Sequence, residues 1–364
     1  MTDQPAGSPG GAGLPCAFVH ASMLRTEPES PASPVSSYPS PSLTPMTAET
    51  VLSPSADPAP GRVPGRDERP SGPSLSPSRA ADFKTCPLLF RFRTIDRLPE
   101  KPTPDQVRGT LVHAVLERLF DLPAADRTPE SAAALVAPEW ERLIEQEPVL
   151  GGLFAPAEDA PDALVSDEPD RIAAFLAGAG DLLSGYFAVE DPQRLEPAER
   201  ESLVSTLVDD ELLIRGYIDR LDVSPAGDLR VVDYKTGGAP REAFEGRALF
   251  QLKFYALVLW RTRGVVPRVL RLLYLKDAEI CDYSPDASEL ERFERTLVAL
   301  SQAIERAKAE KDFRPKPSKL CGWCSHQAFC PEFGGTPPPY PEPVEVIVGD
   351  VSAVAEAAEP TIEP

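Results

Sequence analysis

Three charged side chains on two neighbouring predicted strands have the types and spacing to do chemistry. Asp233 and Lys235 lie two residues apart in a short apolar run that predicts a strand. Residues two apart in a strand project to the same face, so the carboxylate and the ammonium enter one space. The turn-rich segment 224–228 precedes this run and predicts a hairpin with the strand that contains Asp219.

The register of this hairpin decides what the two carboxylates can do. Pairing of Val223 with Leu229 would place Asp219 opposite Asp233. Like charges directly opposite each other destabilise a sheet unless something offsets them, and a divalent cation beside Lys235 would do so. This arrangement is typical of metal-dependent nucleases, in which the metal orients water and the lysine stabilises charge on the phosphate. Taken alone, the pattern D-x-K is also common as an exposed ion pair.

Further polar residues occupy predicted helices. His113 lies in an amphipathic pattern over 104–121 and could be a third metal ligand, since imidazole suits Mn²⁺ better than Mg²⁺. Gln251 and Tyr255 lie four apart in a helix predicted over 241–262, so they share one face, suited to phosphate or water contacts. Singly, each of these residues is more often an ordinary core or surface side chain.

Four of the six cysteines have the spacing of a metal centre: Cys86, Cys321, Cys324 and Cys330. Without a secretory context such spacing indicates a metal or a cluster rather than disulfides. Four thiolates suit either tetrahedral zinc or a cubane iron–sulfur cluster, and the spacing leaves both open. His326 could also replace a cysteine as a zinc ligand, although a surface position is the more usual one for a histidine in such a loop.

Composition divides the 364 residues into a folded body and two arms. Residues 1–73 and 335–364 are rich in proline and small residues, and we expect both arms to be disordered. The body, 74–334, is large enough for a sizeable core. No apolar run is long enough to span a bilayer and no signal peptide is evident, so the sequence predicts a soluble cytoplasmic protein without a membrane partner.

The formal net charge of −20 comes from three segments: 1–73, 121–170 and 335–364. The remaining sequence has balanced acidic and basic residues, so charge neither supports nor excludes a nucleic-acid partner. The chain also lacks the G-x-x-x-x-G-K-[ST] pattern of a nucleotide-driven motor.

The order of predicted elements indicates the fold class. A short helix over 77–86, the helix over 104–121 and an acidic helical insertion over about 121–195 come first. A three-stranded meander over 203–208, 212–223 and 229–235, the helix over 241–262, a strand over 268–276 and a long helix over 287–311 follow. This order predicts an α/β fold with a mixed central sheet flanked by helices.

Taken in order, these residues resemble the RecB-type exonuclease family of the PD-(D/E)XK nuclease superfamily, with its restriction-endonuclease-like core. The resemblance covers residues 74–334, and Val232 stands where that superfamily's name has proline. The matching motifs are Ser76-Pro77-Ser78, Cys86-Pro87, Gly109-x-x-x-His113, Gly216-x-x-Asp219-Arg220-x-Asp222, Asp233-x-Lys235, Gln251-x-x-x-Tyr255 and Cys321-x2-Cys324-x5-Cys330-Pro331. The pattern is similar to the nuclease domain of the AddB helicase–nuclease subunit and to CRISPR-associated iron–sulfur exonucleases.

The resemblance implies a role for each motif. His113, Asp219, Asp233 and the backbone carbonyl of Tyr234 would bind Mg²⁺ or Mn²⁺, and Lys235 would be the catalytic lysine. Gln251 and Tyr255 would position DNA or that lysine.

The resemblance also implies a structural [4Fe–4S] cluster on the four spaced cysteines, which favours iron–sulfur over zinc. The expected activity is that of a DNA exonuclease that prefers single strands or ends, in repair or recombination, with a separate helicase or recombination protein as a partner. The alternative is a non-catalytic iron–sulfur DNA-binding subunit of a helicase complex.

Overall fold

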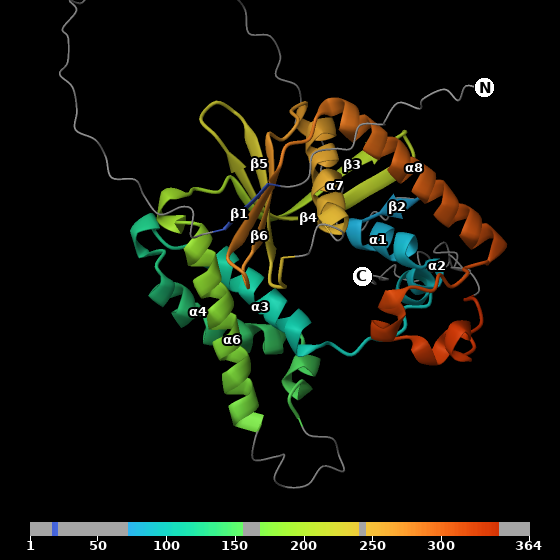
Figure 1. The fold of residues 1–364 in the computed structure, drawn as a ribbon, viewed down its shortest axis with the longest axis horizontal. Helices are drawn as coiled ribbons and strands as arrows, with labels where there is room; N and C mark the ends of the chain where they lie inside the picture. The colour runs from blue at the N-terminus through green and yellow to red at the C-terminus, as the bar shows by residue number, and fades with distance from the viewer. Residues whose placement is uncertain (1–16, 21–71, 156–167, 240–244, 342–364) are drawn as a thin grey trace, which may run out of the picture. The chain divides into compact units, whose positions relative to one another are not determined.

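The computed structural model describes residues 17–20, 72–155, 168–239 and 245–341 (Figure 1). The chain divides into two compact units: residues 1–77 with 102–302, and residues 78–101 with 303–364. Most of residues 1–73 and 335–364, the two arms predicted to be disordered, lies outside the described residues. Within the first arm the structure places a short strand, Ala17–His20, that the sequence does not predict.

Each predicted helix is present, with bounds that differ by a few residues. The α-helices are α1 (Pro77–Thr85), α2 (Pro87–Phe90), α3 (Pro104–Leu119), α4 (Pro129–Gln146), α6 (Glu168–Val189), α7 (Glu245–Arg263) and α8 (Ala287–Glu310). A π-helical turn, Arg91–Ile95, follows α2. Short 3₁₀ turns occur at Ala124–Asp126, Pro148–Gly152, Pro192–Arg194, Lys319–Trp323, Gln327–Phe329 and Pro331–Phe333. The N-cap Thr103 starts α3 with a capping box to Gln106.

The first unit is built on a mixed sheet, as the sequence predicts. Its strands are β1 (Ala17–His20), β2 (Ser74–Leu75), β3 (Glu199–Val208), β4 (Leu212–Val223), β5 (Leu229–Lys235), β6 (Val269–Tyr274) and β7 (Glu279–Tyr283). They follow the order β1-β7-β6-β5-β4-β2, and β3 pairs with β4. The pairs β5–β6 and β2–β4 are parallel, and the others are antiparallel.

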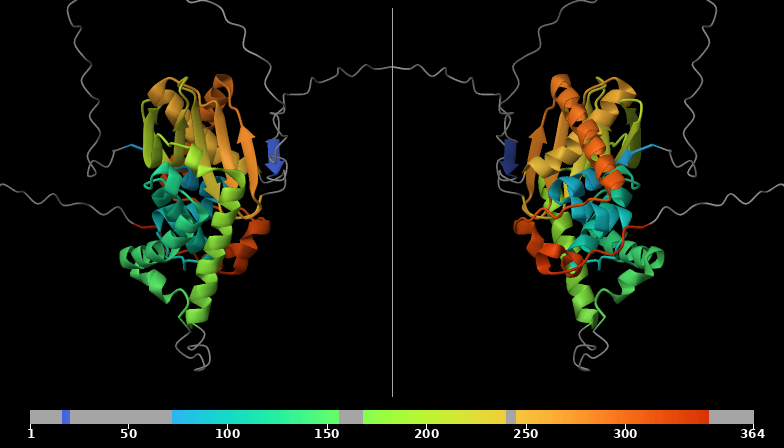
Figure 2. Two further views of the ribbon diagram at one scale, coloured as in Figure 1. Left: turned by 90° about the vertical axis from the view of Figure 1, so that its left-hand side faces the viewer. Right: turned by 90° about the vertical axis from the view of Figure 1, so that its right-hand side faces the viewer.

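Helices cover both faces of the central strands (Figures 1 and 2). Residues 232 and 234 of β5 pack with α3, α4 and α6 on one face. The crossover helix α7 contacts β3 to β6, and it joins the parallel strands β5 and β6. Because α7 begins soon after β5 ends, the crossover carries side chains of this helix to the end of β5, where Lys235 lies.

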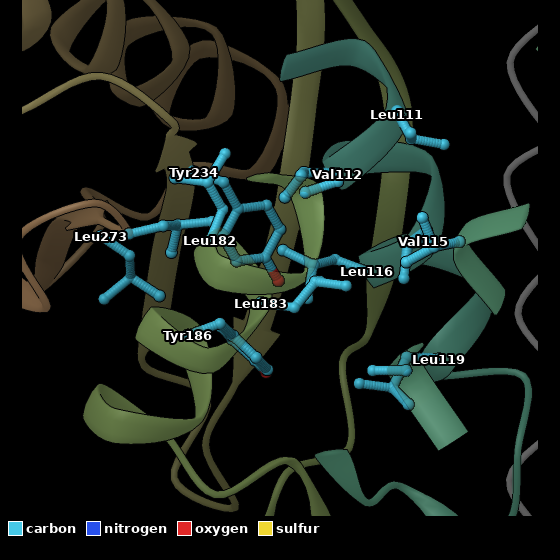
Figure 3. Close-up of a cluster of buried hydrophobic side chains, with 14 of the residues drawn as sticks. Leu111, Val112, Val115, Leu116, Leu119, Leu182, Leu183, Tyr186, Tyr234 and Leu273 are labelled. Carbon is cyan, nitrogen blue, oxygen red and sulfur yellow. The ribbon is translucent and has the colours of Figure 1, made fainter. Parts of the chain in front are cut away.

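A buried aliphatic and aromatic cluster holds the first face together (Figure 3). The side chains labelled in the figure come from α3, α6, β5 and β6: Leu111, Val112, Val115, Leu116, Leu119, Leu182, Leu183, Tyr186, Tyr234 and Leu273. Helix α4 adds Trp140, whose ring lies 5.0 Å from that of Phe175 on α6. The acidic insertion over 121–195 therefore supplies part of the core through its helices α4 and α6.

Helix α6 lies very close to the end of β6. A Cβ at Gly185 would stand 1.8 Å from the carbonyl oxygen of Leu275, so only glycine allows this approach. By length and composition alone α6 could cross a membrane. Its side chains at Phe175, Leu183 and Tyr186 are instead buried in the cluster of the first unit.

Candidate active site

A row of polar contacts links β5 to α7. Lys235 Nζ lies 2.5 Å from Asp233 Oδ2 and donates a hydrogen bond to Gln251 Oε1 at 3.0 Å. Gln251 Nε2 donates in turn to the Tyr255 hydroxyl at 3.0 Å. The structure thus brings together four of the predicted site residues. It holds the Lys235 ammonium between a buried carboxylate, 2 % exposed, and an amide.

The β4–β5 hairpin has the predicted register, with Val223 opposite Leu229. The ladder of paired residues ends one pair before Asp219 and Asp233. There, Asp219 Oδ2 accepts a hydrogen bond from the Tyr234 backbone N–H at 2.8 Å. The two carboxylates therefore lie where β4 and β5 stop pairing with each other, although both strands keep their other partners.

A glycine allows α3 to bring its histidine to this place. A Cβ at Gly109 would lie 3.1 Å from Thr236 Oγ1, just after β5 ends. One turn later, His113 Nδ1 lies 3.5 Å from Asp219 Oδ2, and Nε2 lies 3.0 Å from the Tyr234 carbonyl oxygen. With the proton on Nε2, that carbonyl accepts its hydrogen bond and Nδ1 faces the carboxylates. The carbonyl predicted as a metal ligand is thus the partner of His113.

Glu201 completes the group, and the sequence does not predict it. Its Oε1 lies 3.8 Å from His113 Nδ1, and ligand atoms of Glu201, His113 and Asp219 all lie within 4.8 Å of one another. Glu201 has a φ of +42°, a region that is unusual for residues other than glycine. The β3–β4 ladder skips Glu201 and Asp219 while pairing residues on both sides of them. This local distortion sits at the acidic group, as strained backbone often does at functional sites.

The group holds an excess of negative charge in a buried place. Burial raises the pKa of Asp219, the nearby charge of Asp233 raises it further, and His113 opposes both, which leaves it at about 7. Burial would lower the pKa of His113, but interactions with Glu201, Asp219 and Asp233 raise it to about 9. Burial also raises the pKa of Tyr255 above its usual range, so its hydroxyl stays protonated.

These donors fit a hard divalent cation. Carboxylate oxygens are preferred by Mg²⁺ and Mn²⁺, and an imidazole among them is better tolerated by Mn²⁺. Asp233 adds a further carboxylate beside these donors, and its buried Oδ2 has the Lys235 ammonium as a partner at 2.5 Å. A cation at His113, Glu201 and Asp219 would offset the repulsion among the carboxylates.

A comparison with protein families agrees with this geometry. The profile described as the PD-(D/E)XK nuclease superfamily matches residues 74–331, which is more than half of the chain. The chain belongs to the PD-(D/E)XK nuclease superfamily. Its α/β fold, with a mixed sheet flanked by helices, is the one expected for that superfamily.

Known proteins similar to this PD-(D/E)XK chain include two from mycobacterial phages. The Gene 69 protein of Mycobacterium phage D29 is 25% identical over 275 residues, which cover 72% of this chain and 97% of the phage protein. The Gene 69 protein of Mycobacterium phage L5 is 24% identical over 290 residues, with the same two coverages. Among solved structures, a candidate exonuclease from Eubacterium rectale has a TM-score of 0.45 at 11% identity, over 70% of this chain and 87% of that chain.

Behind the site of this PD-(D/E)XK chain, a buried ionic network anchors β4. Arg220 is fully buried and donates to both carboxylate oxygens of Glu190, at 2.7 and 2.9 Å. It also donates to Asp222 at 3.1 and 3.2 Å, and to the Tyr234 hydroxyl at 2.9 Å. Since Arg220 follows Asp219 directly, this network holds the backbone that carries a site carboxylate.

The four spaced cysteines belong to the second unit, and all four are free. Backbone N–H groups of Lys316 and Ser318 donate to the sulfurs of Cys86 and Cys321, at 3.3 and 3.2 Å. Burial raises the pKa of the Cys330 thiol. Four free sulfurs in one unit, two of which accept backbone hydrogen bonds, are a donor set that fits a metal centre bound through sulfur.

His326 is not among these sulfur ligands. It is buried in the second unit, where its Nε2 lies 2.7 Å from Glu100 Oε1 and its ring lies against Phe92 at 5.4 Å. This carboxylate contact leaves His326 with a packing role rather than the zinc-ligand role considered from the sequence.

Proposed function

We propose that this chain is a divalent-metal-dependent nuclease that hydrolyses phosphodiester bonds of DNA. The observation that carries the proposal is the polar row from Asp233 through Lys235 to Gln251, beside the group of His113 and Asp219. An ammonium held in place beside a donor set for a hard cation can stabilise the negative charge that develops on a phosphodiester during hydrolysis.

Each side chain then has a defined task. His113, Asp219 and Asp233 would hold Mg²⁺ or Mn²⁺, as the resemblance implies, and the geometry adds Glu201. When bound, the ion would offset the negative charge of the phosphate and lower the pKa of a bound water molecule. Lys235 would donate to a phosphate oxygen and stabilise the charge that develops there, and Gln251 would keep its ammonium in place.

We further propose the RecB-type exonuclease activity that the motifs resemble. The enzyme would act in the cytoplasm on single-stranded DNA or DNA ends during repair or recombination. We also propose a separate helicase or recombination protein as its partner. This is the role expected of a nuclease module similar to that of AddB.

The second unit would hold a [4Fe–4S] cluster on Cys86, Cys321, Cys324 and Cys330. The four sulfurs are free and belong to one unit, and the family resemblance favours the iron–sulfur centre over zinc. Such a centre would join residue 86 to residues 321–330.

The decisive experiment compares wild-type protein with Lys235→Ala on end-labelled linear and circular single-stranded DNA, in Mn²⁺, with protein purified without oxygen. Linear DNA should be degraded and circular DNA spared, and Lys235→Ala should lose the activity. Lys253→Ala, on α7 but paired with Glu289 at 2.7 Å, is the matched control and should cleave normally. Cleavage by Lys235→Ala at the wild-type rate would refute the mechanism. Absence of cleavage by wild-type protein with an intact cluster would favour the accessory DNA-binding subunit instead.

A further inference from the structure

The exposed face of the β3–β4 hairpin is unusually apolar. Leu203, Leu207 and Tyr217 are 56, 57 and 57 % exposed. Single exposed apolar residues are ordinary, but here they share one surface on two paired strands. In the described part of the chain, Tyr217 forms no hydrogen bond, so its ring and hydroxyl both face solvent.

The register arranges these residues in a row that ends at the metal-ligand group. Leu203 pairs with Tyr217, and Ser205 pairs with Arg215 one step further out. Since alternate residues of a strand share a face, the row continues inward from Tyr217 to Asp219.

One cavity joins this row to the site. Tyr217 lines the same cavity of about 490 Å³ as His113 and Glu201, together with polar residues of α3. The exposed ring therefore stands at the mouth of the space where a reacting phosphate would lie.

The charges along the row identify its occupant. Arg215 is exposed and has no hydrogen bond or ion pair among the described residues, so it can bind a phosphate. Beyond Arg215 the hairpin ends in Asp209, Asp210 and Glu211, which would repel phosphates and so limit the row to its inner half. A single-stranded nucleic acid has flat bases on a flexible, negatively charged backbone. Tyr217 and the neighbouring Leu203 can contact the bases, and the Arg215 guanidinium can bind a phosphate.

We propose that this hairpin face binds single-stranded nucleic acid, with bases stacked on Tyr217 and Leu203 and a phosphate held by Arg215. The proposal rests on the proposed nuclease function, and it specifies how that site selects its substrate. In a duplex the bases stack on one another and their faces are covered, so only unpaired nucleotides can use this surface. The single-strand preference then comes from Tyr217 and Leu203 rather than from the metal group.

The test is a binding measurement in EDTA, so that it does not depend on cleavage. Fluorescence anisotropy of a labelled oligothymidylate should show roughly 5- to 150-fold weaker binding by Tyr217→Ala, the cost of losing one stacked base. Tyr217→Phe keeps the ring and should bind like wild type. Val149→Ala removes an apolar side chain that is 70 % exposed in the same unit, and serves as the control.

An abasic strand of equal length separates stacking from general attraction. Wild type should bind it about as weakly as Tyr217→Ala binds the normal strand, and Tyr217→Ala should lose little more. Arg215→Gln should lower the slope of log affinity against log salt by about 0.7, the value for one phosphate contact on a single strand. Tyr217→Ala should leave that slope unchanged.

Equal affinity of wild type and Tyr217→Ala for the oligothymidylate would overturn the proposal, and so would equal binding of normal and abasic strands by wild type. Either result leaves the cleavage comparison between wild type and Lys235→Ala intact. Conversely, loss of binding in Tyr217→Ala with no cleavage by wild type would support the surface while removing the proposed nuclease function.

Discussion

Replacing Arg220 by methionine should destabilise the first unit strongly, because it leaves a buried carboxylate without its main partner. Both the Arg220 and Glu190 side chains are nearly inaccessible, at 0 and 4 % exposure. Breaking such a pair by removing one member costs about 3–5 kcal/mol, since the remaining charge stays buried. Arg271 Nη1 lies 3.5 Å from Glu190 and partly compensates, which places the expected loss near the lower limit, about 3 kcal/mol.

The double variant Arg220→Met/Glu190→Leu should recover most of this loss. Replacing a buried ion pair by apolar residues of similar volume is often close to neutral. Asp222 keeps Arg230 as a partner at 2.8 Å, so the second carboxylate is not left alone. The lost hydrogen bond to Tyr234 costs about 1 kcal/mol, so we expect the double variant to lie within about 2 kcal/mol of wild type.

Urea unfolding followed by tryptophan fluorescence measures these changes. The Trp323→Phe background confines the signal to Trp140 and Trp260, which both belong to the first unit. The free energy of unfolding should fall with an unchanged m-value, as expected when the native surface is preserved. The matched control, Arg268→Met, removes an arginine that is 73 % exposed in its pair with Asp228, and should change stability by less than about 0.5 kcal/mol. A single variant as stable as this control, or a double variant as unstable as the single one, would refute the reasoning.

Three other changes probe other parts of the molecule. Gly185→Ala should destabilise the first unit by about 1–3 kcal/mol or more, because its Cβ would overlap Leu275, whereas Gly180→Ala, with open space, should be neutral or stabilising in the same urea measurement. Glu201→Gln should weaken Mn²⁺ binding measured by calorimetry, and unchanged affinity would remove Glu201 from the ligand group. Cys330→Ser should abolish the brown colour of protein purified without oxygen, and a colourless wild type that contains zinc would contradict the iron–sulfur assignment.

Local spacing was enough to predict the part of the site that lies on β5 and α7. Asp233 and Lys235 share a face because a strand repeats every two residues, and Gln251 and Tyr255 because a helix repeats every 3.6. The hairpin register followed from turn-forming residues between two apolar runs, and the structure has the predicted Val223–Leu229 pair. Where a contact depends on such short-range geometry, sequence alone specifies it.

The elements that sequence analysis missed depend on distant partners instead. Strand β2 has only two residues and exists because it pairs with β4, far along the chain. Strand β7 is short and follows a turn at Ala278. Ala278 has a positive φ, which alanine rarely adopts, so the sequence does not indicate this turn. Net charge also does not show that the acidic insertion packs into the core, where the rings of Trp140 and Phe175 lie against each other.

Glu201 was not predicted as a member of the acidic group because the strand that carries it was predicted too short. The predicted strand began at residue 203, so Glu201 lay outside it, although extending the pairing of Leu203 with Tyr217 by two residues brings Glu201 opposite Asp219. What sequence could not supply is the positive φ, since glutamate has no preference for it. A residue that adopts this conformation is held there by its surroundings, and here those are His113 and Asp219 on two other elements. The acidic group is therefore a property of the assembled fold, because His113 on α3 is far along the chain from the β3–β4 hairpin that carries Glu201 and Asp219.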